Sequence, residues 1–160
     1  PSAVAPPHAY LNEKPLPEPE VAVMMNRSRV GLLLSAAEGA CFSSGEYLLC
    51  GLPVVSTPSR GGRDIWYNEY NALIVDADPD AVAAGVEYFL ANPRDPQRIR
   101  QMHIDQAKSH RARFIAALDD VLWRFGASDI DAGAYFRANY IHKMRRSERP
   151  PFEAIFGSGR

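Results

Sequence analysis

The sequence has few of the features that mark unusual protein classes. It contains 2 cysteines in 160 residues, Cys41 and Cys50, and without a second pair it does not indicate a zinc site. No apolar run approaches the roughly 20 residues that span a bilayer. The formal net charge is −1, so no overall field attracts nucleic acid. We therefore expect free thiols in a reducing compartment, the cytoplasm, with the protein either free or peripheral to a membrane.

Both ends of the sequence are irregular in composition. The start has no initiator methionine and no signal peptide, because residues 1–4 offer neither a basic region nor a hydrophobic stretch. This suggests a chain cut from a longer one. Residues 1–16 are proline-rich and read as an irregular lead-in, with a candidate short strand at residues 9–11. The basic residues between Lys143 and Arg149 are typical of a solvated tail.

Between these ends, short apolar runs alternate with segments of helical periodicity. The runs at 30–34, 53–56 and 72–75 lack polar alternation, which indicates parallel strands buried on both faces. Strands that alternate with helices predict an α/β fold, with a Rossmann-like parallel sheet flanked by helices. Caps support the helix boundaries, with Asp78 before one helix and Gly51 after another. The predicted helices cover residues 17–27, 42–50, 79–92, 95–109, 112–125 and 132–146.

We divide the chain into the lead-in 1–16, a Rossmann-like domain 17–125, and a C-terminal helix with tail at 126–160. Between residues 132 and 144, apolar side chains recur at spacings of three and four, which predicts a helix with an apolar stripe. Such a stripe needs a surface to cover it. Either it closes onto the sheet of its own domain, or it reaches a surface beyond it.

Two loops follow predicted strands, where open α/β sheets bind their ligands. The small-residue loop at 35–42 opens a helix, so its backbone N–H groups and the helix dipole suit a phosphate. Glu38 lies in this loop and Glu46 about a turn into the helix. Ionised carboxylates accept hydrogen bonds from vicinal hydroxyls, although such a pair is also common on solvated surfaces. In the second loop, at 56–64, paired glycines permit close backbone approach.

The stretch 38–75 resembles the C-terminal domain of retaining GT-B glycosyltransferases of the group 1 type. The resemblance rests on five pieces in the family's order, each weak alone. They are Glu38-Gly39 with Glu46, similar to the Glu-x7-Glu motif; Gly51-Leu52-Pro53-Val54-Val55; Gly61-Gly62 with Asp64, similar to a glycine-pair loop closed by an acid; Asn71-Ala72-Leu73-Ile74-Val75; and Asp78-Pro79-Asp80-Ala81-Val82.

The resemblance implies a role for each matching residue. The family's first glutamate contacts hydroxyls of the donor sugar, so Glu38 is the candidate catalytic residue. Its second glutamate holds the nucleotide ribose, and backbone amides between the two meet the pyrophosphate. No metal or other cofactor is implied, and the substrate is a nucleotide sugar such as a UDP-, GDP- or ADP-sugar. The implied sugar-donor contacts are Gly39, Ala40, Cys41, Phe42, Glu46, Gly61, Gly62 and Arg63.

The resemblance also implies partners. The chain would be the C-terminal half of a GT-B fold with extra C-terminal helices, and an N-terminal Rossmann-like domain of the same protein would bind the acceptor. The last helix would cross onto that domain, or onto a second copy in a homo-oligomer. The implied activity is hexosyl transfer, with the isolated chain inactive. Two alternatives remain: a degenerate scaffold, favoured by Ala40-Cys41 and by the lack of a basic pair upstream of Glu38, or half of a sugar-nucleotide 2-epimerase or phosphorylase.

Overall fold

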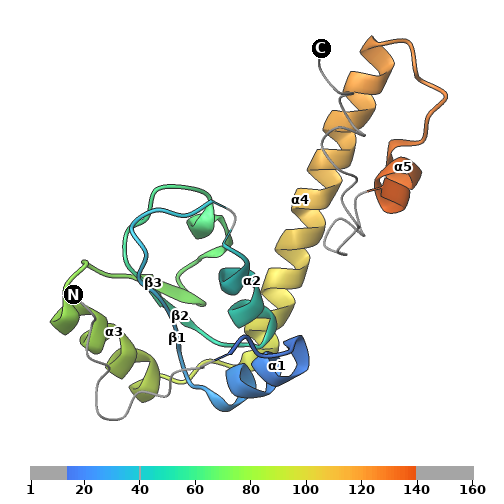
Figure 1. The fold of residues 1–160 in the computed structure, drawn as a ribbon. Helices are drawn as coiled ribbons and strands as arrows, with labels where there is room; N and C mark the ends of the chain where they lie inside the picture. Colours follow the sequence, from blue (N-terminus) through green and yellow to red (C-terminus); the bar gives the residue numbers. More distant parts are fainter. Residues whose placement is uncertain (1–13, 40, 140–160) are drawn as a thin grey trace, which may run out of the picture. The chain divides into compact units, whose positions relative to one another are not determined.

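The computed structural model describes residues 14–39 and 41–139 (Figure 1). The chain divides into two compact units, residues 1–107 and 108–160. The candidate strand at 9–11, Ala40, the basic tail and the predicted helix beyond residue 139 lie outside the described residues. The first unit contains α1 (Glu18–Arg27), β1 (Gly31–Leu33), α2 (Phe42–Leu49), β2 (Val54–Ser56), the 3-10 helix η1 (Arg63–Trp66), β3 (Ala72–Ile74), α3 (Pro79–Ala91) and the first turns of α4 (Pro96–Arg124).

The three strands form one parallel sheet in the order β1-β2-β3. Val54 is aligned with Gly31 on one side and with Ala72 on the other. All three residues of the central strand β2 are buried, as its continuous apolar sequence predicts. The predicted α/β fold with a parallel sheet flanked by helices is therefore confirmed.

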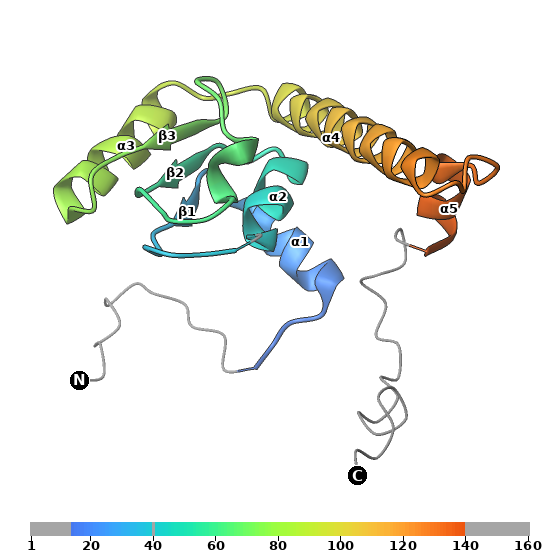
Figure 2. The same cartoon turned by 90° about the horizontal axis from the view of Figure 1, so that it is seen from above.

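The two faces of the sheet are covered by different helices (Figure 2). Successive side chains of a strand point to opposite faces. Val54 joins Leu48 of α2 and Ile99 of α4 in the main core cluster, whereas Val55 lies against Gly85 of α3. The outer strands are less covered, because Leu32 of β1 is 44% exposed and Ile74 of β3 is 51% exposed. The expectation that residues 30–34 are buried on both faces is therefore wrong for β1.

The helix α4 corrects one prediction. Residues 95–109 and 112–125 were expected to form two helices, but α4 runs without interruption from Pro96 to Arg124. Its residues His110 and Arg111 are polar, and polarity alone does not end a helix. With neither glycine nor proline in the interval, nothing breaks the backbone ladder.

The second unit contains the later turns of α4 and the helix α5 (Ala132–Asn139). α4 gives way to a turn in which Gly126 has φ +74°. Asp131 accepts a hydrogen bond from Ala134 N–H (2.8 Å) at the start of α5, so the predicted helix begins where its spacing indicated. Phe136 meets Phe114 edge to face, with ring centroids 5.6 Å apart. In the described part of the chain, no helix is long and apolar enough to cross a membrane.

Candidate functional site

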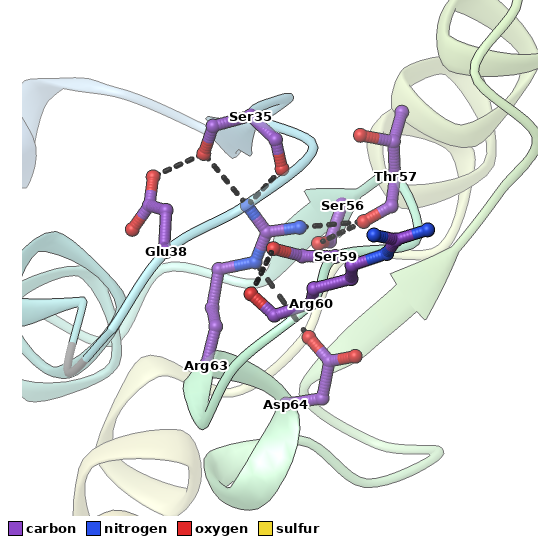
Figure 3. Close-up of polar contacts among 8 residues, drawn as sticks. All are labelled: Ser35, Glu38, Ser56, Thr57, Ser59, Arg60, Arg63 and Asp64. Carbon is purple, nitrogen blue, oxygen red and sulfur yellow. Dashed lines mark hydrogen bonds and ion pairs between the residues drawn. The ribbon is translucent and has the colours of Figure 1, made fainter.

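The loops that follow β1 and β2 are joined to each other (Figure 3). Ala37 and Arg60 form a parallel bridge beyond the ends of the strands. Glu38 N–H donates to Arg60 O (2.9 Å), and Arg60 N–H donates to Ala36 O (3.0 Å). The glutamate loop and the glycine loop are therefore one structure at the carboxyl edge of the sheet.

The side chain of Arg63 hydrogen-bonds to both of these loops. Arg63 is the first residue of η1 and is 1% exposed. Its Nη1 donates to Ser35 O (3.1 Å) and Ser35 Oγ (3.0 Å), and its Nη2 donates to Thr57 O. Its Nε lies 3.6 Å from Asp64 Oδ1, an ion pair too long for a hydrogen bond. The planar guanidinium offers donors in several fixed directions, which this arrangement uses.

Glu38 is held in the ionised form by its neighbours. Hydrogen bonding from the Cys41 thiol lowers the pKa of Glu38 most, followed by hydrogen bonding from Ser35 Oγ. The charge of Arg63 adds a smaller effect in the same direction, opposed by partial desolvation. Burial, together with the Glu38 carboxylate, raises the pKa of the Cys41 thiol. At neutral pH the pair is a carboxylate beside a neutral thiol, and the carboxylate is an acceptor of hydrogen bonds.

Glycine is required at one position of the second loop. Gly61 has φ +125°, and a Cβ there would lie 1.5 Å from the carbonyl oxygen of Glu38. By contrast, a Cβ at Gly39 or Gly62 would meet nothing within 4 Å. The backbone at these two positions faces open space, so a ligand can approach it closely.

The amino end of α2 faces the same edge of the sheet. Cys41 is its N-cap residue, no side-chain oxygen caps the helix, and its first turn carries no acid. Phe42 is 62% exposed beside it. The helix dipole and the first N–H groups of such an end favour an anion.

Glu46 lies apart from the contacts that join the two loops. Glu46 is exposed on α2 and lines a groove of about 450 Å³ between α1 and α2, opposite Glu18 and Val21. Within the described residues, no hydrogen bond or ion pair connects Glu46 to the two loops. The loops therefore bring together Glu38, Cys41, Gly61 and Arg63, and Glu46 stands outside this set.

Sequence reasoning missed several residues that support the site. Ser35 bridges Glu38 and Arg63, and its signal was its position directly after a strand. Tyr67 lies half-buried under the loops, and burial raises the pKa of its hydroxyl. Among the described residues, its oxygen and Ser44 Oγ are buried without a hydrogen-bond partner. The position of Tyr67 after the glycine loop is compatible with either the rim of a pocket or packing beneath the loop, and the sequence does not decide between the two.

In the described ranges, no group of three or more His, Cys, Asp or Glu side chains could hold a metal ion. Residues 13–106 match the family model described as "Glycosyl transferases group 1". No curated protein and no solved structure matched the chain.

Proposed function

This chain belongs to the group 1 glycosyl transferases, and from that premise we propose that the joined loops are the sugar-donor site of a retaining hexosyltransferase. Domains of this family supply the half of the enzyme that binds the nucleotide sugar. The acceptor is bound by an N-terminal domain of the same protein. The isolated chain then binds the sugar donor and does not catalyse transfer.

The observation that supports this proposal is the position of an ionised Glu38 beside open backbone and a helix amino end. The carboxylate accepts hydrogen bonds from hydroxyls of the donor sugar. The backbone of residues 39–42 at the start of α2, with Gly61 and Gly62, receives the diphosphate. N–H groups fixed in place also stabilise the charge that develops on the departing diphosphate.

Arg63 acts on the sugar donor indirectly in this proposal. It was expected to contact the ligand, but its side chain is fully buried and bonded to Ser35 and Thr57. We assign it as a positioning residue, because it fixes the loop that carries Glu38 relative to the loop that carries the glycine pair.

Two substitutions separate the roles of the glutamates. We expect Glu46→Ala to weaken nucleoside diphosphate binding by roughly 1.5–3 kcal/mol, the value of a charge-assisted hydrogen bond to the ribose. Glu38→Gln leaves diphosphate binding nearly unchanged and lowers transfer by the protein with its N-terminal domain, since Glu38 meets only the sugar. Calorimetry of the chain with UDP, GDP and ADP, and turnover of the longer protein, give the two measurements.

Each result bears on a separate part of the proposal. Unchanged affinity in a folded Glu46→Ala variant contradicts the assignment of Glu46 to the ribose. The position of Glu46 on the α1–α2 groove makes this assignment easier to contradict than that of Glu38. Equal losses of affinity and turnover in Glu38→Gln contradict the division of roles. If the unsubstituted chain binds none of the three diphosphates, the scaffold alternative replaces the enzyme.

A further inference from the structure

One cavity of the first unit lies at the amino ends of the strands, away from the joined loops. It measures about 610 Å³ and is lined by residues that immediately precede β1 and β2, Arg29 and Pro53 among them. The glutamate and glycine loops follow the same strands at their carboxyl ends. The volume is within the usual range of ligand pockets.

Three arginines line this cavity, and no acid does. Arg27 and Arg29 are exposed, and within the described part of the chain neither has a recorded hydrogen bond or ion pair. The third, Arg94, is anchored by Tyr70 O (3.2 Å) and Tyr88 Oη (2.9 Å). No carboxylate pairs with any of the three among the described residues.

A structural explanation of these arginines accounts for only part of their charge. α1 ends at Arg27 and α3 ends at Ala91, so two helix carboxyl ends lie beside the cavity. Each carries about half a negative elementary charge. Three guanidinium groups therefore leave a surplus of about two positive charges. The nearest acid in sequence, Asp95, does not line the cavity. Its carboxylate accepts from Gln97 N–H (2.9 Å) at the start of α4.

Part of the cavity lining is apolar. Leu52 and Phe89 are buried core residues, and Leu90 is exposed. A surplus of about two positive charges beside apolar side chains matches a dianionic group attached to a partly apolar body. Guanidinium groups favour phosphate because their N–H fork matches its oxygens.

We propose that this cavity, at the amino ends of β1 and β2, binds a phosphate or diphosphate group carried by a partly apolar molecule. It is a second site, separate from the sugar-donor loops. Arg94 contacts the anion with a guanidinium that is already held by hydrogen bonds. Arg27 and Arg29 contact it from the end of α1.

Titration of the ¹⁵N-labelled chain with pyrophosphate tests the site and locates it. We expect amide shifts at residues 26–31 and 89–95. The double variant Arg27→Gln/Arg29→Gln should weaken this binding about tenfold or more, since it removes two charge-assisted contacts. The control Arg100→Gln/Arg113→Gln removes two charges from exposed positions of α4 outside the lining, and it should stay within about twofold of the parent chain.

Two further experiments distinguish a free metabolite from a lipid headgroup as the source of the phosphate. A soluble hexose phosphate that shifts the same amides supports a free metabolite. Sedimentation with phosphatidic acid vesicles, lost in the double variant, supports a lipid headgroup. Shifts confined to residues 35–42 and 57–64 overturn the proposal and leave the sugar-donor site intact. Equal weakening in the control also overturns it, because general charge would then explain the binding.

Discussion

Arg63 supplies hydrogen-bond donors between the paired strands and the Ala37–Arg60 bridge. Ser35 O and Thr57 O both accept from its guanidinium. A buried cation is tolerated only when its partners satisfy it, because desolvation costs several kcal/mol per ion. Lysine cannot substitute for this arrangement, since a single ammonium lacks the planar fork.

We therefore expect Arg63→Lys to lower the free energy of unfolding by roughly 2–4 kcal/mol, as carbonyl oxygens lose their donors. Urea unfolding measures this loss. The folded variant should also bind nucleoside diphosphate more weakly, which a purely structural role distant from the site would not produce. Arg60→Gln, an exposed neighbour that pairs through its backbone, should stay within about 0.5 kcal/mol of the parent. Parent-like stability and affinity in Arg63→Lys would refute the positioning role.

The sequence indicated some of these residues and not others. Glu38 and the glycine pair were identified because their order along the chain matches a family pattern. The role of Arg63 was not, because an arginine in a glycine loop suits a phosphate contact as well as a buried clamp. A ligand contact and a buried clamp are distinguished only by the burial of Arg63 and by the positions of Ser35 O and Thr57 O. Burial and these positions depend on long-range packing.

At the scale of elements, two glycines inside helices differ in the space that their surroundings leave for a side chain. A Cβ at Gly45 of α2 would lie 3.5 Å from His103 Nε2, an ordinary van der Waals contact. A Cβ at Gly85 of α3 would lie 3.0 Å from Val55 Cγ1. Val55 is fully buried in the central strand and has little space to move. Gly85 is thus needed for close packing of α3 on the sheet, and Gly45 is not.

This difference predicts opposite effects of the same substitution. Gly45→Ala should stabilise the protein by about 0.5–1 kcal/mol, because alanine is the better helix former. Gly85→Ala should destabilise it by about 1–3 kcal/mol through overpacking. Thermal or urea unfolding of the two variants provides the comparison, each serving as the other's control. Destabilisation by Gly45→Ala would show that α2 and α4 pack too tightly at His103 for a methyl group.

Element prediction succeeded where a local pattern was sufficient. The apolar run at 53–56 indicated a buried strand, and the Asp78 cap with Pro79 marked the start of α3, where Asp78 accepts from Asp80 N–H (3.0 Å). It failed in α4, where two helices were expected and one continuous helix runs from Pro96 to Arg124. The face of α2 that carries Glu46 was also beyond sequence reasoning, because it depends on where α1 packs.

At the scale of the molecule, the family match and the first compact unit nearly coincide. The match covers residues 13–106, and the first unit ends at Ala107. The second unit has its own aromatic contact between Phe114 and Phe136, and it exposes Trp123 and Phe125. We propose that this apolar surface is covered by the N-terminal domain or by a second copy of the chain.

Deletion of residues 129–160 tests this proposal. Because α5 belongs to the second unit, the truncated chain should keep its nucleoside diphosphate affinity. Its melting temperature should fall by less than about 4 °C, the change expected for roughly 1 kcal/mol in a domain of this size. Differential scanning calorimetry of the full and truncated chains measures it. A fall of many degrees in a monomeric chain would show that the C-terminal helix completes the core of the sheet.

The hydrogen bonds from Arg63 to Ser35 span 28 residues, and this separation sets the order in which the chain can fold during synthesis. The ribosome delivers Glu38 before Arg63 emerges, and closing a loop of that length costs entropy that β1–β2 pairing and core packing must offset. A growing chain therefore displays the glutamate motif before it has a site. Ligand capture starts only after the second loop has left the ribosome, so the nucleotide sugar cannot assist the earliest folding steps.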